Sequence, residues 1–204
     1  MIYQSPYPDL ELFDGSVYDL IFHNLTAADA GRPAITELTT GNSITYTELK
    51  EEADAMAGYL AAHDIGPGSV VSLQIPNCID FAVALFGIFR AGATVNPIGV
   101  LMNPKDVERI AGMAGADFFI GVSDVGSEQH LWHYEVERIA EKRLPAPDIH
   151  VDGNTLASVP FSSGTTGMPK GVMLTHNNLT SNVLQARYML EKNDIGPHTK
   201  TLSP

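Results

Sequence analysis

Short apolar runs alternate with longer amphipathic stretches between Ile44 and Val122, and this order restricts the fold more than any other feature of the chain. Three runs have the composition of buried strands: 70–75, 93–96 and 117–122. Two stretches between them carry apolar residues at helical spacing: 79–89 and 103–115. Alternating strands and helices with short connections are typical of parallel sheets with crossover helices. The sequence therefore predicts an α/β protein with parallel-sheet layers flanked by helices.

Cap residues mark the ends of the expected helices. One helix begins after Thr45, which has Glu48 three residues later, or after Thr47, since either threonine can serve as the N-cap. Another begins at Asn103-Pro104, with asparagine as the cap and proline at the first helical position, and ends near Gly115. These caps support the same alternation of strands and helices.

The rest of the chain is less regular, above all over Ser123–Asn154. Four further elements are expected: a helix at 135–143, short strands at 149–151 and 172–174, and a helix from about Asn177. A new strand is expected to begin at Thr201–Pro204. A compact domain seldom ends in this way, so we expect residues 1–204 to be a fragment of a longer domain.

The most specific motif is SSGTTGMPKG at Ser162–Gly171. Gly164 and Gly167 allow the backbone to approach an anion closely, and successive free N–H groups in such a turn form a concave anion site. Four hydroxyl groups that can donate to phosphate oxygens or bind Mg²⁺ lie in the same segment: Ser162, Ser163, Thr165 and Thr166. Lys170 supplies a full positive charge. The motif therefore predicts a phosphate-binding loop.

The surroundings of the motif agree with this interpretation. From Gly153 through Leu190 the sequence contains no Asp or Glu, although the chain holds 24 such residues. A second acid-free stretch, Phe81–Lys105, is explained by burial alone, so the depletion only supports the motif. The Walker A pattern fails because Pro169 stands where its second glycine is required. A plain Ser/Thr/Gly-rich surface turn does not explain a lysine and a proline at these offsets.

Composition and charge disfavour several kinds of partner. The net charge of −12 argues against nucleic acid and against docking on anionic membranes, both of which attract basic surfaces. Cys78 is the only cysteine, so an internal disulfide is impossible and a reducing, cytoplasmic location is expected. The N-terminal residues do not resemble a signal peptide, and the longest apolar stretch, Phe81–Phe89, is too short to span a bilayer. No pattern indicates the oligomeric state.

The motif and its flanks resemble a known family. VPFSSGTTGMPKGVMLTHNNL at Val159–Leu179 is similar to the signature of the adenylate-forming superfamily, which includes acyl-CoA synthetases, luciferases and the adenylation domains of non-ribosomal peptide synthetases. Ile44–Ile98 resembles the first part of that family's large N-terminal domain. The form of the motif is most similar to fatty-acyl and 4-coumarate CoA ligases. The resemblance implies that residues 1–204 are the N-terminal portion of the AMP-binding domain, without the C-terminal domain.

The resemblance implies a role for each part of the loop. Ser162–Gly171 is expected to hold the β- and γ-phosphates of ATP, with Thr165 and Thr166 near phosphate or Mg²⁺. Lys170 is expected to offset charge on the departing pyrophosphate. In this family a carboxylate attacks the α-phosphorus to give an acyl-adenylate, and a thiol, usually that of CoA, then displaces AMP to give a thioester. ATP, Mg²⁺ and CoA are the implied cofactors, and a fatty or aryl acid is the implied substrate.

The same resemblance implies that the reaction needs residues beyond this chain. The family's catalytic lysine belongs to the C-terminal domain, so we expect no catalytic residue within these 204 residues and no activity from the fragment alone. Two alternatives remain open at this point. The chain can belong to an adenylation domain that loads a carrier protein instead of CoA, or to a non-catalytic nucleotide-binding or interaction module.

His130 and His133 have a spacing that suits a metal ion, with Glu128 and Glu135 beside them. Zinc sites, however, use three or four converging ligands, and no partner cluster is evident in the sequence. We therefore interpret this segment as a polar helix start or an exposed loop.

Other reactive or aromatic residues have simpler explanations than catalysis. His176 follows an expected strand and is interpreted as a helix-start or packing residue. Cys78 has no evident activating partner and is interpreted as a small buried residue. Phe86 and Phe89 share a helical stripe that is typical of a core. The charges over 50–54 are expected to form a solvated helix face.

Overall fold

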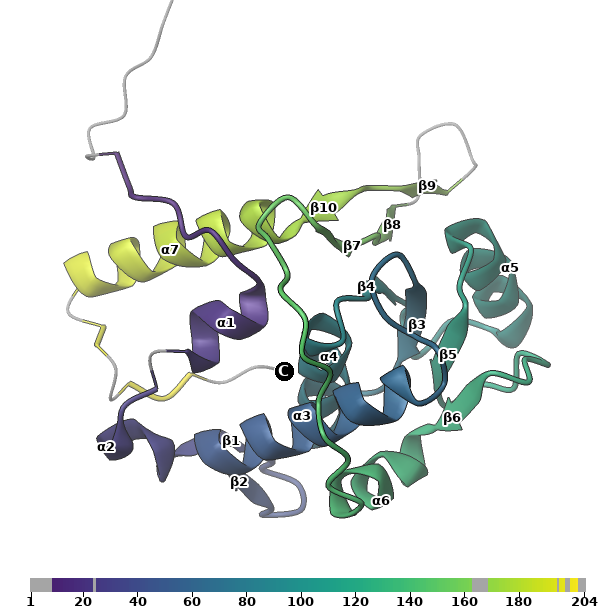
Figure 1. The fold of residues 1–204 in the computed structure, drawn as a ribbon, viewed down its shortest axis with the longest axis horizontal. Coiled ribbons are helices and arrows are strands. Elements are labelled where there is room, and N and C mark those ends of the chain that lie inside the picture. The colour runs from purple at the N-terminus through teal and green to yellow at the C-terminus, as the bar shows by residue number, and fades with distance from the viewer. Residues whose placement is uncertain (1–8, 24, 163–168, 194, 197–198, 202–204) are drawn as a thin grey trace, which may run out of the picture.

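A six-stranded sheet forms the centre of the computed structural model, which describes residues 9–23, 25–162, 169–193, 195–196 and 199–201. The strand order is β10-β7-β4-β3-β5-β6, and every neighbouring pair is parallel except β10 and β7 (Figure 1). The strands are β3 (Val70–Gln74), β4 (Thr94–Pro97), β5 (Phe118–Gly121), β6 (His130–Trp132), β7 (Leu156–Ser158) and β10 (Leu174–Thr175). The predicted α/β class is confirmed.

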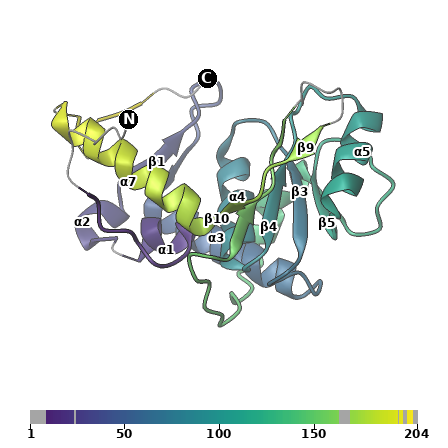
Figure 2. The same ribbon diagram turned by 90° about the horizontal axis from the view of Figure 1, so that it is seen from above.

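Helices cover both faces of the sheet (Figure 2). One face carries α1 (Val17–Phe22), α3 (Tyr46–Ala61), α4 (Ile79–Arg90) and α6 (Val136–Glu141), and the other carries α5 (Pro104–Ala114). Strand β5 shows the alternation that this layering requires. Phe118 and Ile120 belong to the large core cluster with α3 and α4, whereas Phe119 belongs to a smaller cluster with α5. The predicted layers are therefore present.

Strand β3 lies between the two strands that follow it in the chain. The chain moves to β4 on one side through α4 and then to β5 on the other side through α5. Because parallel crossovers are right-handed, opposite directions of travel place α4 and α5 on opposite faces. Ligands of open α/β sheets bind outside the carboxyl ends of the strands at such a switch point. The topology therefore directs attention to the ends of β3, β4 and β7.

The helix caps follow the sequence closely. Thr45 is the N-cap of α3, because its hydroxyl accepts the Glu48 N–H at 3.2 Å while the Glu48 carboxylate accepts the Thr45 N–H at 2.8 Å. The Thr47 hydroxyl instead donates to a backbone carbonyl outside the helix. Asn103 caps α5, which ends at Gly115 with a φ of 66°. Glycine adopts this left-handed conformation without the strain that a side chain causes.

Two expected strands differ from the structure. Residues 149–151 form no strand, although Ile149 packs near Gly92 and Val151 is buried, so their apolar character reflects packing rather than strand pairing. Of the strand expected at 172–174 only Leu174 lies in a strand, because the chain forms two short strands on either side of 172–173. The strand β9 (Lys170–Gly171) pairs with β8 (Phe161–Ser162), and β10 pairs with β7. The strand expected to begin at 201–204 lies largely outside the described residues.

The remaining elements are short or follow the loop. They are α2 (Ala27–Ala30), the antiparallel pair β1 (Pro33–Thr36) and β2 (Ser43–Thr45), a 3₁₀ turn (His133–Glu135) and α7 (His176–Lys192). The helix expected from Asn177 is thus present one residue earlier. None of the helices in the described part of the chain is long and apolar enough to cross a membrane.

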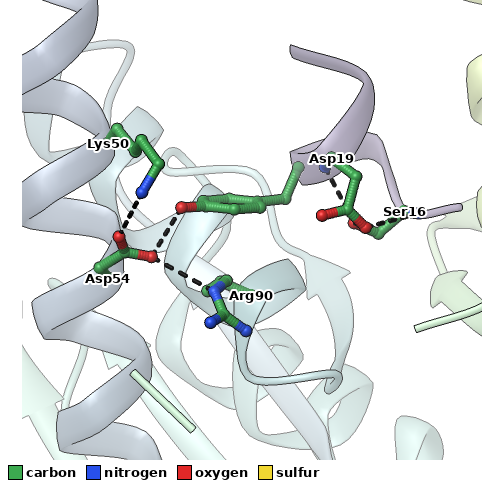
Figure 3. A network of polar contacts seen from close by, with 6 residues as sticks. Ser16, Asp19, Lys50, Asp54 and Arg90 are labelled. Atoms are coloured by element: carbon green, nitrogen blue, oxygen red, sulfur yellow. Dashed lines mark hydrogen bonds and ion pairs between the residues drawn. The ribbon is translucent and has the colours of Figure 1, made fainter. Parts of the chain in front are cut away.

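A polar network joins α1 to α3 and α4 (Figure 3). The Tyr18 hydroxyl donates to Asp54 at 2.6 Å, and Asp54 also pairs with Lys50 at 2.7 Å and Arg90 at 3.3 Å. Burial, helped by the hydrogen bond to Asp54, raises the pKa of Tyr18 well above its usual range. The phenol is therefore a structural donor, and the helix face over 50–54 is only partly the solvated surface that the sequence suggests.

Candidate nucleotide site

The predicted phosphate loop follows the carboxyl end of β7, the second strand from one edge of the sheet. Strand β7 lies parallel to β4, and the pairing continues through a hydrogen bond from the Val159 N–H to the Val95 carbonyl at 2.8 Å. The chain then enters β8, which pairs antiparallel with β9. In this pairing Ser162 stands opposite Lys170, and Phe161 stands opposite Gly171. The structure therefore brings the two ends of the motif together as the base of a hairpin.

The inner part of the motif lies outside the described residues. It comprises Ser163, Gly164, Thr165, Thr166 and Gly167, and their predicted roles remain predictions. The described base of the hairpin is exposed at both Ser162 and Lys170. Within the described part of the chain, Lys170 takes part in no ion pair. Its side chain is exposed to solvent.

Close packing holds this hairpin against the sheet. A Cβ atom at Gly171 would lie 2.9 Å from Val159 Cγ1 and 3.1 Å from Phe161 Cζ, which leaves no room for a side chain. Phe161 itself packs on the small core cluster under α5. The Val172 N–H donates to the Pro160 carbonyl at 2.9 Å, just beyond the hairpin. The loop thus has a fixed base on a rigid layer.

The segment after the hairpin is anchored to the start of β7. The His176 N–H donates to the Thr155 carbonyl at 3.0 Å, and the Asn177 N–H donates to the Gly153 carbonyl at 2.7 Å. A Cβ atom at Gly153 would overlap the Asn177 amide. Thr175 caps α7 and shares a capping box with Asn178. Both sides of the loop are therefore connected to the same strand.

His176 is a packing residue, as the sequence suggests. Its side chain is fully buried, its Nδ1 accepts the Val17 N–H at 3.1 Å, and its ring meets the Phe89 ring edge-on at 5.2 Å. Burial lowers the pKa of His176 to about 4, so the ring is neutral near pH 7. An imidazole enclosed in this way cannot reach a substrate proton. The expected core role of Phe89 is confirmed by the same contact.

Buried polar side chains lie beside the loop at the ends of β3 and β4, and the sequence analysis missed them. The Asn96 amide donates to the Ser72 hydroxyl at 2.9 Å, and the Gln74 amide donates to the Gly99 carbonyl at 3.4 Å. The side-chain oxygens of Gln74 and Asn96 have no hydrogen-bond partner among the described residues. The available signal was the presence of polar residues within otherwise apolar strands. Such oxygens can accept from a bound water or a ligand donor.

The two candidate histidines of the central segment separate from one another. His130 lies in β6, with its ring 5.1 Å from Phe119 and 4.3 Å from Trp132, and burial lowers its pKa. His133 points instead toward Cys78 and Asp80. His133 begins the 3₁₀ turn that leads into α6, so the interpretation as a polar helix start holds for this residue. The sequence showed no partner cluster, but the fold supplies one from a segment 55 residues away. Cys78 is only partly buried, and burial raises the pKa of its thiol.

Comparison with known proteins gives consistent matches. The model of the family described as AMP-binding enzyme matches residues 22–204. A 4-coumarate–CoA ligase of Pinus taeda is 31% identical over 90% of this chain and 38% of its own length. Surfactin synthase subunit 3 of Bacillus subtilis is 30% identical over 82% of this chain and 14% of its own length. This chain thus spans less than two fifths of these curated relatives.

Solved structures with a similar fold also match this chain. The N-terminal subdomain of Klebsiella oxytoca NpsA, solved in complex with 3-hydroxyanthranilyl-AMSN, superimposes with a TM-score of 0.69 at 23% identity. The superposition covers 79% of this chain and 41% of that one. A sequence identity this low supports the fold alone, whereas the family match covers most of the chain. Taken with the loop at the carboxyl edge of the parallel strands, these matches show that the chain belongs to the AMP-binding enzyme family.

Proposed function

We propose that this chain is the N-terminal part of an enzyme that uses ATP to activate a carboxylic acid. The acid forms an acyl-adenylate with release of pyrophosphate, and CoA then displaces AMP to give a thioester. The observation that carries the proposal is the position of the SSGTTGMPKG hairpin, with Ser162 facing Lys170 beyond the carboxyl end of β7. The proposal concerns the whole protein, in which residues 1–204 contribute the phosphate site.

The residues of the loop have distinct roles in this proposal. Backbone N–H groups and the hydroxyls of Ser162 and Ser163 orient the β- and γ-phosphates, while the Lys170 ammonium stabilises the negative charge that develops on pyrophosphate. Mg²⁺ supplies further neutralisation of that charge when it enters with ATP. Thr165 and Thr166 offer hydroxyl oxygens, a donor type that Mg²⁺ accepts, and we propose them as its nearest protein oxygens.

The acid is proposed to be a fatty or aryl acid. This choice is supported by the relatives, which include a 4-coumarate–CoA ligase and, at 26% identity, a long-chain-fatty-acid–CoA ligase of Haemophilus influenzae. The described residues contain buried polar side chains at the ends of β3 and β4 but no element that distinguishes these two acids. A panel of acids of both classes would decide between them.

The test is carboxylate-dependent exchange of labelled pyrophosphate into ATP by the intact protein. We expect Lys170→Ala to reduce the exchange rate by about 10²- to 10³-fold, the effect of removing one group that stabilises transition-state charge. Lys192→Ala removes an equally exposed lysine from the far end of α7 and should leave the rate unchanged. Equal rates in the wild type and Lys170→Ala would remove the proposed role of Lys170.

A second acceptor is supported by the match to surfactin synthase subunit 3. In that alternative the acyl group passes to the thiol of a carrier protein. The two acceptors differ in the second half-reaction only, so exchange occurs in both. Release of AMP on addition of free CoA would favour the ligase, whereas release only with a carrier protein would favour the adenylation domain. Nucleotide binding without any exchange would indicate a non-catalytic module.

A further inference from the structure

Three potential metal ligands converge at the start of α4, which follows the carboxyl end of β3. Cys78 precedes the helix, Asp80 lies in its first turn, and His133 comes from the 3₁₀ turn after β6. The ligand atoms of these three side chains all lie within 4.8 Å of one another. The cluster combines a thiol, a carboxylate and an imidazole, which are the three side-chain donors that zinc uses.

The two distances from His133 are close to those of a zinc site. His133 Nε2 lies 3.7 Å from Cys78 Sγ and 3.0 Å from Asp80 Oδ2. Zinc bonds of about 2.3 Å to sulfur and about 2.0–2.1 Å to nitrogen or oxygen, at tetrahedral angles, separate neighbouring ligand atoms by about 3.3–3.6 Å. The Cys78 and Asp80 ligand atoms lie within 4.8 Å of each other, so small side-chain movements would bring all three onto one ion.

The charges around the cluster favour a cation over an anion. Glu37 and Glu137 both lie near enough to add negative charge at Asp80. The Glu37 carboxylate accepts the Ile79 N–H at 2.8 Å, and its negative charge offsets the positive N-terminal end of α4 next to the cluster. About 30% of each of the Asp80 and His133 side chains is exposed, at 29% and 28% respectively, so an ion can enter from solvent.

We propose that Cys78, Asp80 and His133 form a zinc site with a fourth position open to water. On binding, the Cys78 thiol releases its proton to solvent and the sulfur bonds to the ion. His133 binds through the lone pair of Nε2, and a proton on that atom, if present, is also released. The site joins the 3₁₀ turn of the segment 123–135 to the start of α4, which are connected otherwise by the imidazole–carboxylate contact. It shares no residue with the proposed phosphate site.

The test is titration of the purified, reduced and chelator-treated chain with Co²⁺, a spectroscopic substitute for zinc. We expect one equivalent to produce a thiolate-to-cobalt charge-transfer band together with the intense visible bands of a tetrahedral ion, and Zn²⁺ to displace it. Because Cys78 is the only cysteine, any thiolate band reports on this residue alone. Absence of the band in the folded wild-type chain would overturn the proposal.

Variants then identify the other two ligands. Cys78→Ser should abolish the band. Asp80→Asn, which keeps the side-chain shape, and His133→Asn, which removes Nε2, should each weaken Co²⁺ binding by at least about tenfold, since even outer partners of metal ligands contribute that much. His150→Asn, at an exposed histidine, should have no effect. Circular dichroism of each variant checks its fold. Undiminished affinity in folded Asp80→Asn and His133→Asn would show simple thiol binding and overturn the three-ligand site.

A second readout needs no variant. Zinc should slow the alkylation of Cys78 in the wild-type chain by at least about tenfold, because a metal-bound thiolate is withdrawn from solution. Equal alkylation rates with and without zinc would contradict the proposal. Pyrophosphate exchange by the intact protein should be the same in Cys78→Ser and the wild type, so the zinc site and the proposed function fail or succeed independently.

Discussion

The parallel block from β3 to β5 and the hairpin formed by β8 and β9 differ in almost every physical respect. In the block, at most 1% of each of Val71, Leu73 and Ile120 is exposed, and the strands pair over several residues. In the hairpin, two residue pairs form the base, and Ser162 and Lys170 are exposed. The residues that stabilise the fold and the residues proposed to bind phosphate therefore lie in separate parts of the fold. Substitutions in one part should therefore leave the property of the other unchanged.

The largest effect on stability is expected from Phe118→Ala in the block. Phe118 is 2% exposed and its ring meets Tyr59 edge-on at 6.3 Å, so truncation leaves a cavity between β5 and α3. We expect the free energy of unfolding to fall by about 3–5 kcal/mol in urea denaturation. Met113→Ala, at a residue 43% exposed on α5, is the control and should change it by less than about 0.5 kcal/mol. A similarly small loss for Phe118→Ala would contradict the claim that the parallel block supplies the stability of the fold.

The next largest effect concerns pH and the anchor of the loop. The folded pKa of His176, about 4, lies below its ordinary value of 6.5, so the folded state binds fewer protons than the unfolded state over that interval. The contribution of neutral His176 to the free energy of unfolding is therefore complete above pH 6.5. It is lost as the pH falls to about 4, by about 3 kcal/mol in total. Denaturation at a series of pH values measures the slope.

Asn at position 176 separates this slope from the titration of carboxylates. His176→Asn retains an acceptor for the Val17 N–H but cannot take up a proton. Stability of the variant should therefore vary less steeply with pH between 6.5 and 4 than that of the wild type. Parallel curves for the two proteins would show that the imidazole is not the group responsible.

Helix packing in the block gives a smaller effect with a control of opposite sign. A Cβ atom at Gly87 would lie 2.6 Å from Met56 Cβ, because α4 and α3 approach each other closely there. We expect Gly87→Ala to lower the free energy of unfolding by about 1–3 kcal/mol through overpacking. Gly112→Ala on α5, where nothing lies within 4 Å of the new atom, should raise it by up to about 1 kcal/mol. A gain in stability for both variants would contradict the packing argument.

The smallest expected effect on stability is that of Lys170→Ala. The side chain is exposed and takes part in no ion pair within the described residues, so its loss should change the free energy of unfolding by less than about 0.5 kcal/mol. The same variant is expected to lose most of its pyrophosphate exchange. A large drop in thermal stability would contradict the comparison, because it would show that the hairpin contributes to the stability of the core.

Local signals made most of the fold predictable from the sequence. The Thr45 capping box, the Asn103-Pro104 start and the glycine at 115 each act within a few residues, and each is found where the pattern places it. Predictions from apolar runs were wrong where residues are buried without forming a strand, as at 149–151. Elements of two to four residues, such as β1 and β8, carry too little periodicity to be recognised.

The candidate sites show the same division between local and distant information. The phosphate motif was recognisable because its glycines, hydroxyls and lysine are adjacent in the chain, and the structure pairs Ser162 with Lys170, which the sequence did not predict. The cluster at Cys78 was not recognisable from the sequence, because His133 reaches Cys78 only through the pairing of β6 with β5. The buried Asn96 amide likewise reaches the Ser72 hydroxyl only because β3 and β4 pair.

The most direct measurement follows the oxygen atoms of the acid. The intact protein is incubated with MgATP, CoA and a carboxylic acid whose carboxylate oxygens are labelled with oxygen-18, and the products are analysed by mass spectrometry. If the carboxylate attacks the α-phosphorus, one labelled oxygen must appear in AMP, with unlabelled pyrophosphate as the other product. Formation of ADP, or label in orthophosphate rather than AMP, would contradict the adenylate chemistry proposed for the Ser162–Gly171 loop.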